Sequence, residues 1–216
     1  IKEKVIKISF GTTLSKFAGG LRQVLIAAAF GVGITYDAYN YAYIIPGFLI
    51  VIIGGINGPL HNAIVAVITP LNNKDGGIVL AQVSIKISLF LIALSLIIYL
   101  NASNCINFIG PNWGLESKSI ATSQLKILAP CIPLSGFIGL SFGALNSRNK
   151  FFISSISPAL ISLTTIVFIL IAWTLNYSKT NLSLLGFESL LAYATLTGTF
   201  LQFVIQIWEI NKINLL

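Results

Sequence analysis

Two cations lie inside an apolar stretch near the start of the chain, LSKFAGGLRQVLIAAAFG (14–31). If a membrane helix enters the bilayer near Ile6, Lys16 lies about ten residues deeper. A rise of ~1.5 Å per residue then places it about 15 Å into a hydrocarbon core about 30 Å thick. A Lys or Arg at the centre of a span costs roughly 2.5 to 3.5 kcal/mol. We therefore expect Lys16 and Arg22 to face a cavity, a counter-charge or water rather than lipid.

The spacing of Lys16 and Arg22 separates their side chains by about 120° on a straight helix, because each residue turns by about 100°. A wide cavity would still contact both. A bend at Gly19 and Gly20 would re-aim one of them, so this glycine pair is a candidate hinge. The alternative is that one cation forms a structural ion pair while the other extends its charged head to the membrane surface.

Asp37 follows in the segment GVGITYDAYNYAY (31–43), after Gly31 and Gly33 have ended the first apolar run. A carboxylate in the first turn of a helix suits the helix dipole. The functional alternative pairs Asp37 with Arg22, since both lie toward the outer side of adjoining runs. The tyrosines of this segment fit an aromatic belt at the membrane interface at least as well as a stack against a ligand.

The stretch IIGGINGP (52–59) predicts a break or bend in the second apolar run. Broken helices in transporters line cavities, so we predict a gate or hinge here. Close helix packing is the alternative. The candidate hinge residues are Gly54, Gly55, Asn57, Gly58 and Pro59. In the fourth run, the spacing of Gly139 and Gly143 favours close contact between helices.

The composition explains why these charges stand out. Of 216 residues, 56% are hydrophobic and 9% are charged, whereas soluble domains carry about 25% charged residues. Continuous apolar runs predict an all-α polytopic membrane protein rather than a β-barrel. We predict about six transmembrane helices in one lobe over residues 1–216, at roughly 6–31, 36–69, 78–100, 119–146, 151–175 and 186–208. The connections, including 101–118, are predicted to be short and polar.

The positive-inside rule orients this lobe. With both termini in the cytoplasm, the cytoplasmic segments hold Lys2, Lys4, Lys7, Lys74, Arg148, Lys150 and Lys212. The opposite segments hold Lys118 and Lys179. This imbalance predicts a multi-pass protein with both termini cytoplasmic.

Several classes of function are not supported. The net charge of +7 is explained by cations that flank apolar runs, so we expect no nucleic-acid partner. No nucleophile–base pair, P-loop or paired buried carboxylates are found, so we do not expect an enzyme. One histidine and no CxxC motif predict no metal site, and no cofactor is implied.

The first two runs resemble the start of the MurJ (MviN) flippase family, within the MOP (multidrug, oligosaccharidyl-lipid, polysaccharide) transporter superfamily. The residues that carry this resemblance are Ser15, Lys16, Gly19, Arg22, Phe30, Gly31, Gly33, Asp37, Ala38 and Pro46. The segment LKILAPCIPLSGFIGLSFGALNSRNKFFISSISP (125–158) resembles the family's fourth and fifth spans, including the element Gly143–Asn146.

The resemblance implies a lipid II flippase. Such a protein moves the undecaprenyl-pyrophosphate-linked peptidoglycan precursor across the bacterial plasma membrane by alternating access of two lobes. This chain would be the N-terminal lobe, with a C-terminal lobe as its partner. The family's cavity residues fall on Lys16, Arg22 and Asp37, which make up the expected substrate-binding site. Lys16 and Arg22 would attract the substrate's pyrophosphate, and Asp37 would hold Arg22 or release it as the cavity closes. The coupling ion is not implied.

The chain also departs from the family's pattern. Many members carry an Arg pair where this chain has Ile50 and Val51, and a Glu-Gly motif near Gly54–Gly55. The residue after the family Arg is often Asp, and here it is Gln23. Two alternatives therefore stay open. One is a related exporter of another lipid-linked oligosaccharide or a drug, and the other is a non-transporting membrane scaffold.

Overall fold

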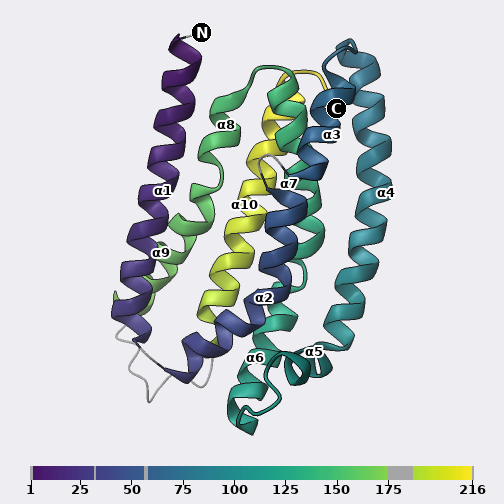
Figure 1. The fold of residues 1–216 in the computed structure, drawn as a ribbon. Coiled ribbons are helices and arrows are strands. Elements are labelled where there is room, and N and C mark those ends of the chain that lie inside the picture. Colours follow the sequence, from purple (N-terminus) through teal and green to yellow (C-terminus); the bar gives the residue numbers. More distant parts are fainter. Residues whose placement is uncertain (1, 32, 56–57, 175–186, 216) are drawn as a thin grey trace.

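The computed structural model describes residues 2–31, 33–55, 58–174 and 187–215, and the regular elements in these ranges are helices. They lie side by side as an elongated bundle (Figure 1). In chain order the elements are α1 Lys2–Phe30, α2 Ile34–Gly54, α3 Pro59–Ile68, α4 Asn73–Leu100, α5 Ala102–Ile109, α6 Leu115–Leu128, α7 Cys131–Ser147, α8 Phe151–Ile156, α9 Ala159–Thr174, the 3-10 helix η2 Phe187–Ser189 and α10 Leu190–Lys212. The predicted all-α class is confirmed.

The long apolar runs are helical, and several of them are interrupted. By length and apolar composition alone, three stretches of the described chain could cross a bilayer, at 34–68, 73–100 and 190–212. The pair α6 and α7, bent by 41°, makes a fourth if it counts as one span. Helix α1 carries Lys16 and Arg22, and α9 has only 16 residues. That α1 and the pair α8–α9 also cross the bilayer remains a prediction.

The connection predicted at 101–118 contains a helix, α5, so that part of the prediction is wrong. Ala102 and Ile106 lie one turn apart on one face of α5 and are fully buried. They join the core cluster that includes Ile120 and Leu125 of α6. Polar neighbours on the other face of α5 hid this short amphipathic pattern in the sequence.

Prolines set the interruption between α6 and α7. Pro133 has no backbone N–H, so the carbonyl of Ala129 lacks its usual donor one turn later. That carbonyl accepts instead from the Ile132 N–H at 3.0 Å and from the Ser95 hydroxyl of α4 at 2.8 Å. A polar side chain on one helix therefore helps to satisfy the break in another, as a bilayer interior requires.

Helix α7 lies at the centre of the bundle, packed against α2, α3, α4 and α10. It approaches α2 and α3 through glycines. A Cβ at Gly143 would lie 2.7 Å from Cβ of Ile64 and 2.8 Å from the His61 carbonyl oxygen. A Cβ at Gly139 would overlap the carbonyl oxygen of Ile53. The close packing predicted for the Gly139–Gly143 spacing is confirmed.

Most of the cations in the connections lie at one end of the bundle. Helix α1 begins and α10 ends at the same end of the bundle, where the α3–α4 and α7–α8 connections also lie (Figure 1). The segments that hold Lys74, Arg148, Lys150 and Lys212 are therefore together. Lys118, near the start of α6, belongs to the opposite end. This arrangement is the one an even number of crossings produces.

Candidate functional site

Helix α1 presents one stripe of residues to the rest of the bundle. The residues of this stripe follow one another at intervals of three or four, or multiples of them, as one face of a helix requires. Positions 11, 18, 26 and 30 are buried, and positions 15 and 22 are partly buried. The stripe packs on α8 and α9. Arg22 thus lies on the packing face of α1, between Ala18 and Ile26, rather than on its outer face.

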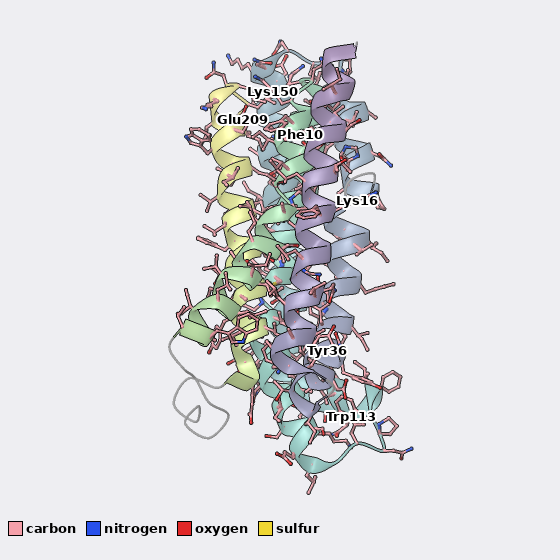
Figure 2. All side chains as sticks on the ribbon, turned by 90° about the vertical axis from the view of Figure 1, so that its left-hand side faces the viewer. Phe10, Lys16, Tyr36, Trp113, Lys150 and Glu209 are labelled. Carbon is pink, nitrogen blue, oxygen red and sulfur yellow. The ribbon has the colours of Figure 1, made fainter. Side chains whose placement is uncertain are left out.

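Lys16 lies outside this stripe. It is two residues from Ala18, which turns it about 200° away on the helix, and its side chain is exposed. Figure 2 places Lys16 about midway along α1. The structure therefore separates the two predicted cations, as the rotation argument indicated. Any single ligand that contacts both must reach around α1.

One N–H group of the Arg22 guanidinium lacks a hydrogen-bond acceptor among the described residues. The Nε of this group is buried and has no hydrogen-bond partner in the ranges that the structure describes. The guanidinium lies close enough to interact electrostatically with the hydroxyls of Tyr39 and Tyr43 on α2. A buried N–H without an acceptor costs about 1 to 3 kcal/mol. An anion placed at Arg22 would remove that penalty.

Tyr39 and Tyr43 stack on each other along α2, within electrostatic range of Arg22. Their rings stack with centroids 5.7 Å apart and planes inclined by 15°. The Tyr39 hydroxyl shares a 2.8 Å hydrogen bond with Oγ1 of Thr195 on α10, which ties α2 to α10. These two tyrosines pack against the core. Their four-residue spacing on a helix turns both toward it, and the interfacial belt and the stack against a ligand both stay predictions.

Asp37 is not paired with Arg22 in this conformation. It is exposed in the first turn of α2, where the helix dipole favours a carboxylate. Within the described ranges, no ion pair joins Asp37 to Arg22. An ion pair is found instead near the end of α10, where Nζ of Lys212 lies 4.0 Å from Oε2 of Glu209. The structure thus places Arg22 within electrostatic range of two tyrosines and does not pair it with the predicted acid.

The second candidate hinge coincides with a helix boundary. Helix α2 ends at Gly54, and α3 begins with Pro59 after the N-cap Gly58. Asn57 lies outside the described residues. Gly54 is buried against α7, where an added Cβ would lie 3.0 Å from Cβ of Ser135. The helix is broken here as predicted, while a gating role for the break stays a prediction.

The first candidate hinge shows no interruption. Helix α1 runs unbroken through Gly19 and Gly20. An added Cβ at Gly20 would meet no atom within 4 Å, and one at Gly19 would meet only Oγ of Ser162 at 3.9 Å. Close packing therefore does not explain Gly19 and Gly20 in this conformation. A bend of α1 at this pair in another conformation stays a prediction.

Replacing Gly20 with alanine tests that role. Alanine fits the space and favours a helix by about 1 kcal/mol relative to glycine. If the pair serves only as helix backbone, Gly20→Ala raises the thermal midpoint slightly and leaves transport unchanged. If α1 must bend there, Gly20→Ala lowers the transport rate while the protein remains at least as stable. Thermal unfolding and transport measured on the same preparation separate the two results.

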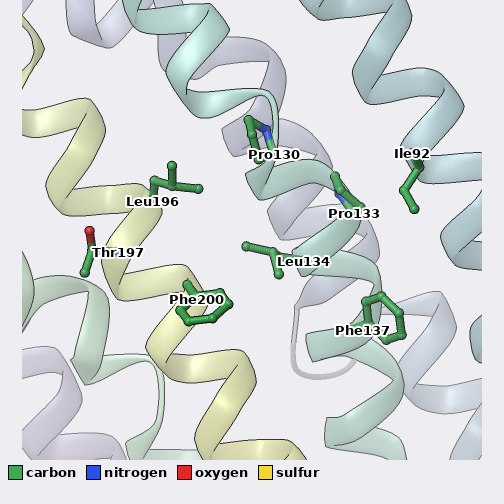
Figure 3. A pocket seen from close by; sticks show the side chains of 8 residues that line it. All are labelled: Ile92, Pro130, Pro133, Leu134, Phe137, Leu196, Thr197 and Phe200. Carbon is green, nitrogen blue, oxygen red and sulfur yellow. The ribbon is translucent and has the colours of Figure 1, made fainter.

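A cavity of about 560 Å³ lies elsewhere, between α4, α7 and α10 (Figure 3). It is lined by Ile92, Pro130, Pro133, Leu134, Phe137, Leu196, Thr197 and Phe200. The Thr197 hydroxyl already donates to the Tyr193 carbonyl at 2.8 Å. Its walls are apolar and bear no charged side chain, so this cavity does not fit a pyrophosphate.

Helix α10 has a buried polar face that is not among the residues predicted from the sequence. Thr195, Thr199, Gln202 and Gln206 are buried, and their spacing places them on one face of an otherwise apolar helix. Gln206 Nε2 donates to Oγ of Ser157 at 2.9 Å, next to the break between α8 and α9. A search for polar residues at helical spacing within an apolar run would have found this face.

Comparisons with known proteins agree on one family. A family model described as "Lipid II flippase MurJ" matches residues 26–216. A "Probable lipid II flippase MurJ" from Synechocystis is 40% identical over 203 residues, which are 93% of this chain and 38% of that relative. A "Lipid II flippase MurJ" from Thermosipho africanus is 31% identical over 162 residues, 75% of this chain and 34% of the relative.

A solved structure of "Lipid II flippase MurJ, inward closed conformation" has the same fold. It superposes with a TM-score of 0.78 at 28% identity, over 96% of this chain and 42% of that one. The chain thus spans less than half the length of the relatives it matches. The range matched by the family model begins at Ile26, so Lys16 and Arg22 precede it.

Proposed function

Because this chain belongs to the MurJ lipid II flippase family, a family of transporters rather than enzymes, we propose that it forms one lobe of a flippase. The full protein would move undecaprenyl-pyrophosphate-linked peptidoglycan precursor across the bacterial plasma membrane. This lobe would alternate, together with a second lobe, between states open to either side. Both termini of the lobe would be cytoplasmic, in agreement with the cations gathered at that end.

The observation that carries this proposal is the state of Arg22. The guanidinium lies on the packing face of α1, and its buried Nε has no partner in the part of the chain that the structure describes. Such a group is suited to an anionic ligand. A guanidinium binds phosphate oxygens through a planar fork of donors. The pyrophosphate of lipid II supplies both the charge and the acceptor oxygens. Lys16, as a second donor on α1, would contact the same headgroup from the exposed side.

The proposed role of Asp37 follows from its separation from Arg22. In the present conformation its carboxylate is free of ion pairs within the described residues. When the substrate has left, Asp37 would come to Arg22 and neutralise it while the cavity closes. Gly54, Gly55 and Gly58, at the boundary of α2 and α3, would permit this movement.

Transport by the reconstituted protein tests the assignment against its main alternative. The protein, in the longest form that its gene encodes, is placed in liposomes with either lipid II or an O-antigen-type lipid-linked sugar. The proposal predicts faster translocation of lipid II. Translocation of the other lipid-linked sugar alone would identify a related exporter instead. The apolar Ile50 and Val51, where many family members carry an Arg pair, are the feature that favours that alternative.

A further inference from the structure

The apolar cavity between α4, α7 and α10 opens at the surface of the bundle. Most of α7 is buried, and its partly exposed positions 133, 134 and 137 lie on one face and line the cavity. Ile92 of α4 and Phe200 of α10, each about half exposed, line it from either side (Figure 3). By length and composition, α4, α10 and the pair α6–α7 are candidates to cross a bilayer. The apolar cavity therefore faces lipid when the lobe lies in a membrane.

An apolar chain fits this cavity better than a polar ligand does. Its volume of about 560 Å³ lies within the range of ~300 to 1,000 Å³ for pockets that enclose small molecules. The lining hydroxyl, on Thr197, already donates to the Tyr193 carbonyl at 2.8 Å, so it needs no partner from a ligand. Deeper in the bundle, the ring of Phe203 contacts those of Phe137 and Phe200, with centroids 5.3 and 6.3 Å apart. These three rings close the deep end of the cavity.

Two walls of the cavity continue to tyrosines at the end of the bundle opposite the termini (Figure 1). On α4, Tyr99 lies seven residues after Ile92, two turns along the same face. On α10, Tyr193 lies seven residues before Phe200, again on the same face. Tyr99 and Tyr193 are 45% and 47% exposed. At ~1.5 Å per residue, each tyrosine lies about 10 Å from the deeper residue of its wall, so both walls reach a tyrosine at a similar level.

Lys126 adds a positive charge at this level. Ala129 and Pro130, which join α6 to α7, have right-handed helical backbone angles. Lys126 therefore lies one turn from Pro130, which lines the cavity, on nearly the same face. Its Nζ lies 5.8 Å from the centroid of the Tyr99 ring. Lys126 is exposed, and no ion pair joins it to a carboxylate of the described chain. Its charge is therefore available to an anion of the surrounding bilayer.

We propose that the apolar cavity is a binding site for an anionic phospholipid of the surrounding bilayer. One acyl chain would fill the cavity, and the headgroup phosphate would lie at Lys126, beside the two tyrosines. An ammonium group attracts a phosphodiester, and the hydroxyls of Tyr99 and Tyr193 can donate to its oxygens. Tyrosines are also enriched where a membrane protein meets the headgroups. The site thus offers one partner to each part of the lipid.

This site is separate from the one proposed at Arg22. The face of α10 that lines the cavity lies opposite Thr195, whose hydroxyl shares a hydrogen bond with that of Tyr39. The phospholipid would therefore bind on a different side of α10 from the tyrosines near Arg22. The proposal requires only that the lobe spans a bilayer, whatever it transports. With both termini cytoplasmic, as proposed above, the phospholipid would come from the outer leaflet.

Photocrosslinking identifies the lipid in the cavity. The protein, in the longest form that its gene encodes, is reconstituted in liposomes of phosphatidylcholine with a minor share of phosphatidylglycerol. The photoreactive residue p-benzoylphenylalanine replaces Phe200 in one preparation and Val167 in the other. Val167 is 49% exposed on α9, a helix that bears no charged side chain, and it does not line the cavity. Mass spectrometry of the crosslinked protein then counts both lipids.

The proposal predicts that position 200 selects phosphatidylglycerol. Its ratio of crosslinked phosphatidylglycerol to phosphatidylcholine should be about fivefold higher than at position 167, which is the factor that one lysine near a membrane surface contributes. In Lys126→Gln the two ratios should become equal, and in Lys126→Arg the preference should remain. Lys118→Gln, which removes a charge from the same end of the bundle, should also keep it.

Three results would overturn the site. Equal ratios at positions 200 and 167 would show that the cavity holds bulk lipid, and a preference that survives Lys126→Gln would remove the headgroup contact. With undecaprenyl pyrophosphate added to the liposomes, crosslinks to this compound in place of phosphatidylglycerol would assign the cavity to a polyprenyl chain. Native mass spectrometry of protein without the photoreactive residue gives a second reading, since Lys126→Gln should retain about fivefold less phosphatidylglycerol. None of these readouts requires transport, so failure of the proposed function would leave them unchanged.

Discussion

Cells that depend on this protein for lipid II translocation are expected to stop growing when Arg22 is replaced by alanine. The substitution removes the one guanidinium on the packing face of α1 and its buried Nε. A hydrogen bond to a charged group contributes about 1.5 to 3 kcal/mol, so substrate affinity should fall about 10- to 100-fold. Complementation of a flippase-depleted strain, at protein levels verified in the membrane, measures this loss.

Two control variants show whether a loss of growth is specific to the guanidinium of Arg22. Lys86→Ala removes the same charge from α4, where Lys86 is exposed, and should support normal growth. Arg22→Lys keeps the charge but loses the planar fork, and should give partial growth. If the double variant Lys16→Ala with Arg22→Ala grows like the wild type, neither cation binds the substrate and the proposed site is wrong.

Replacing Gly143 with leucine should prevent the lobe from folding. Even a Cβ at this position would lie 2.7 Å from Cβ of Ile64 and 2.8 Å from the backbone oxygen of His61. A backbone atom cannot move aside without shifting α3. Overpacking in a tight core costs typically about 1 to 3 kcal/mol for small insertions, and a leucine adds three more carbons than alanine.

Size-exclusion chromatography of the detergent-solubilised protein, monitored during heating, reports this effect. Gly143→Leu should yield aggregated or degraded protein, and Gly143→Ala a lowered thermal midpoint. Gly20→Ala, where an added Cβ meets no atom within 4 Å, serves as the matched glycine substitution and should not lower the midpoint. Normal folding of Gly143→Leu would show that α3 and α7 do not pack as described.

The fold was largely readable from the sequence because the helical signals are local. Continuous apolar runs set the helices, and Pro59 marks the predicted interruption between α2 and α3. The Gly139–Gly143 spacing predicted close packing for a steric reason that needs no tertiary information. Helix α5 was missed, because eight residues with two buried positions give too weak a periodic signal.

The site was only partly readable, because it depends on contacts between distant segments. The depth of Lys16 and Arg22 follows from spacing, and so does the angle between them. Nothing local indicates that Tyr39 bonds Thr195, 156 residues away, or that Gln206 bonds Ser157. The expected pair of Arg22 and Asp37 was inferred from their placement toward one side of the membrane. Proximity along the membrane normal does not fix proximity across the bundle.

The affinity of the purified protein for lipid II reports directly on Arg22, the lobe's proposed main ligand for the pyrophosphate. The dissociation constant should therefore rise about 10- to 100-fold in Arg22→Ala and remain unchanged in Lys86→Ala. It should also rise with salt in the wild type more steeply than in Arg22→Ala, because one charge contact is missing in the variant. Equal affinity of Arg22→Ala and wild type for lipid II would show that Arg22 does not bind the pyrophosphate.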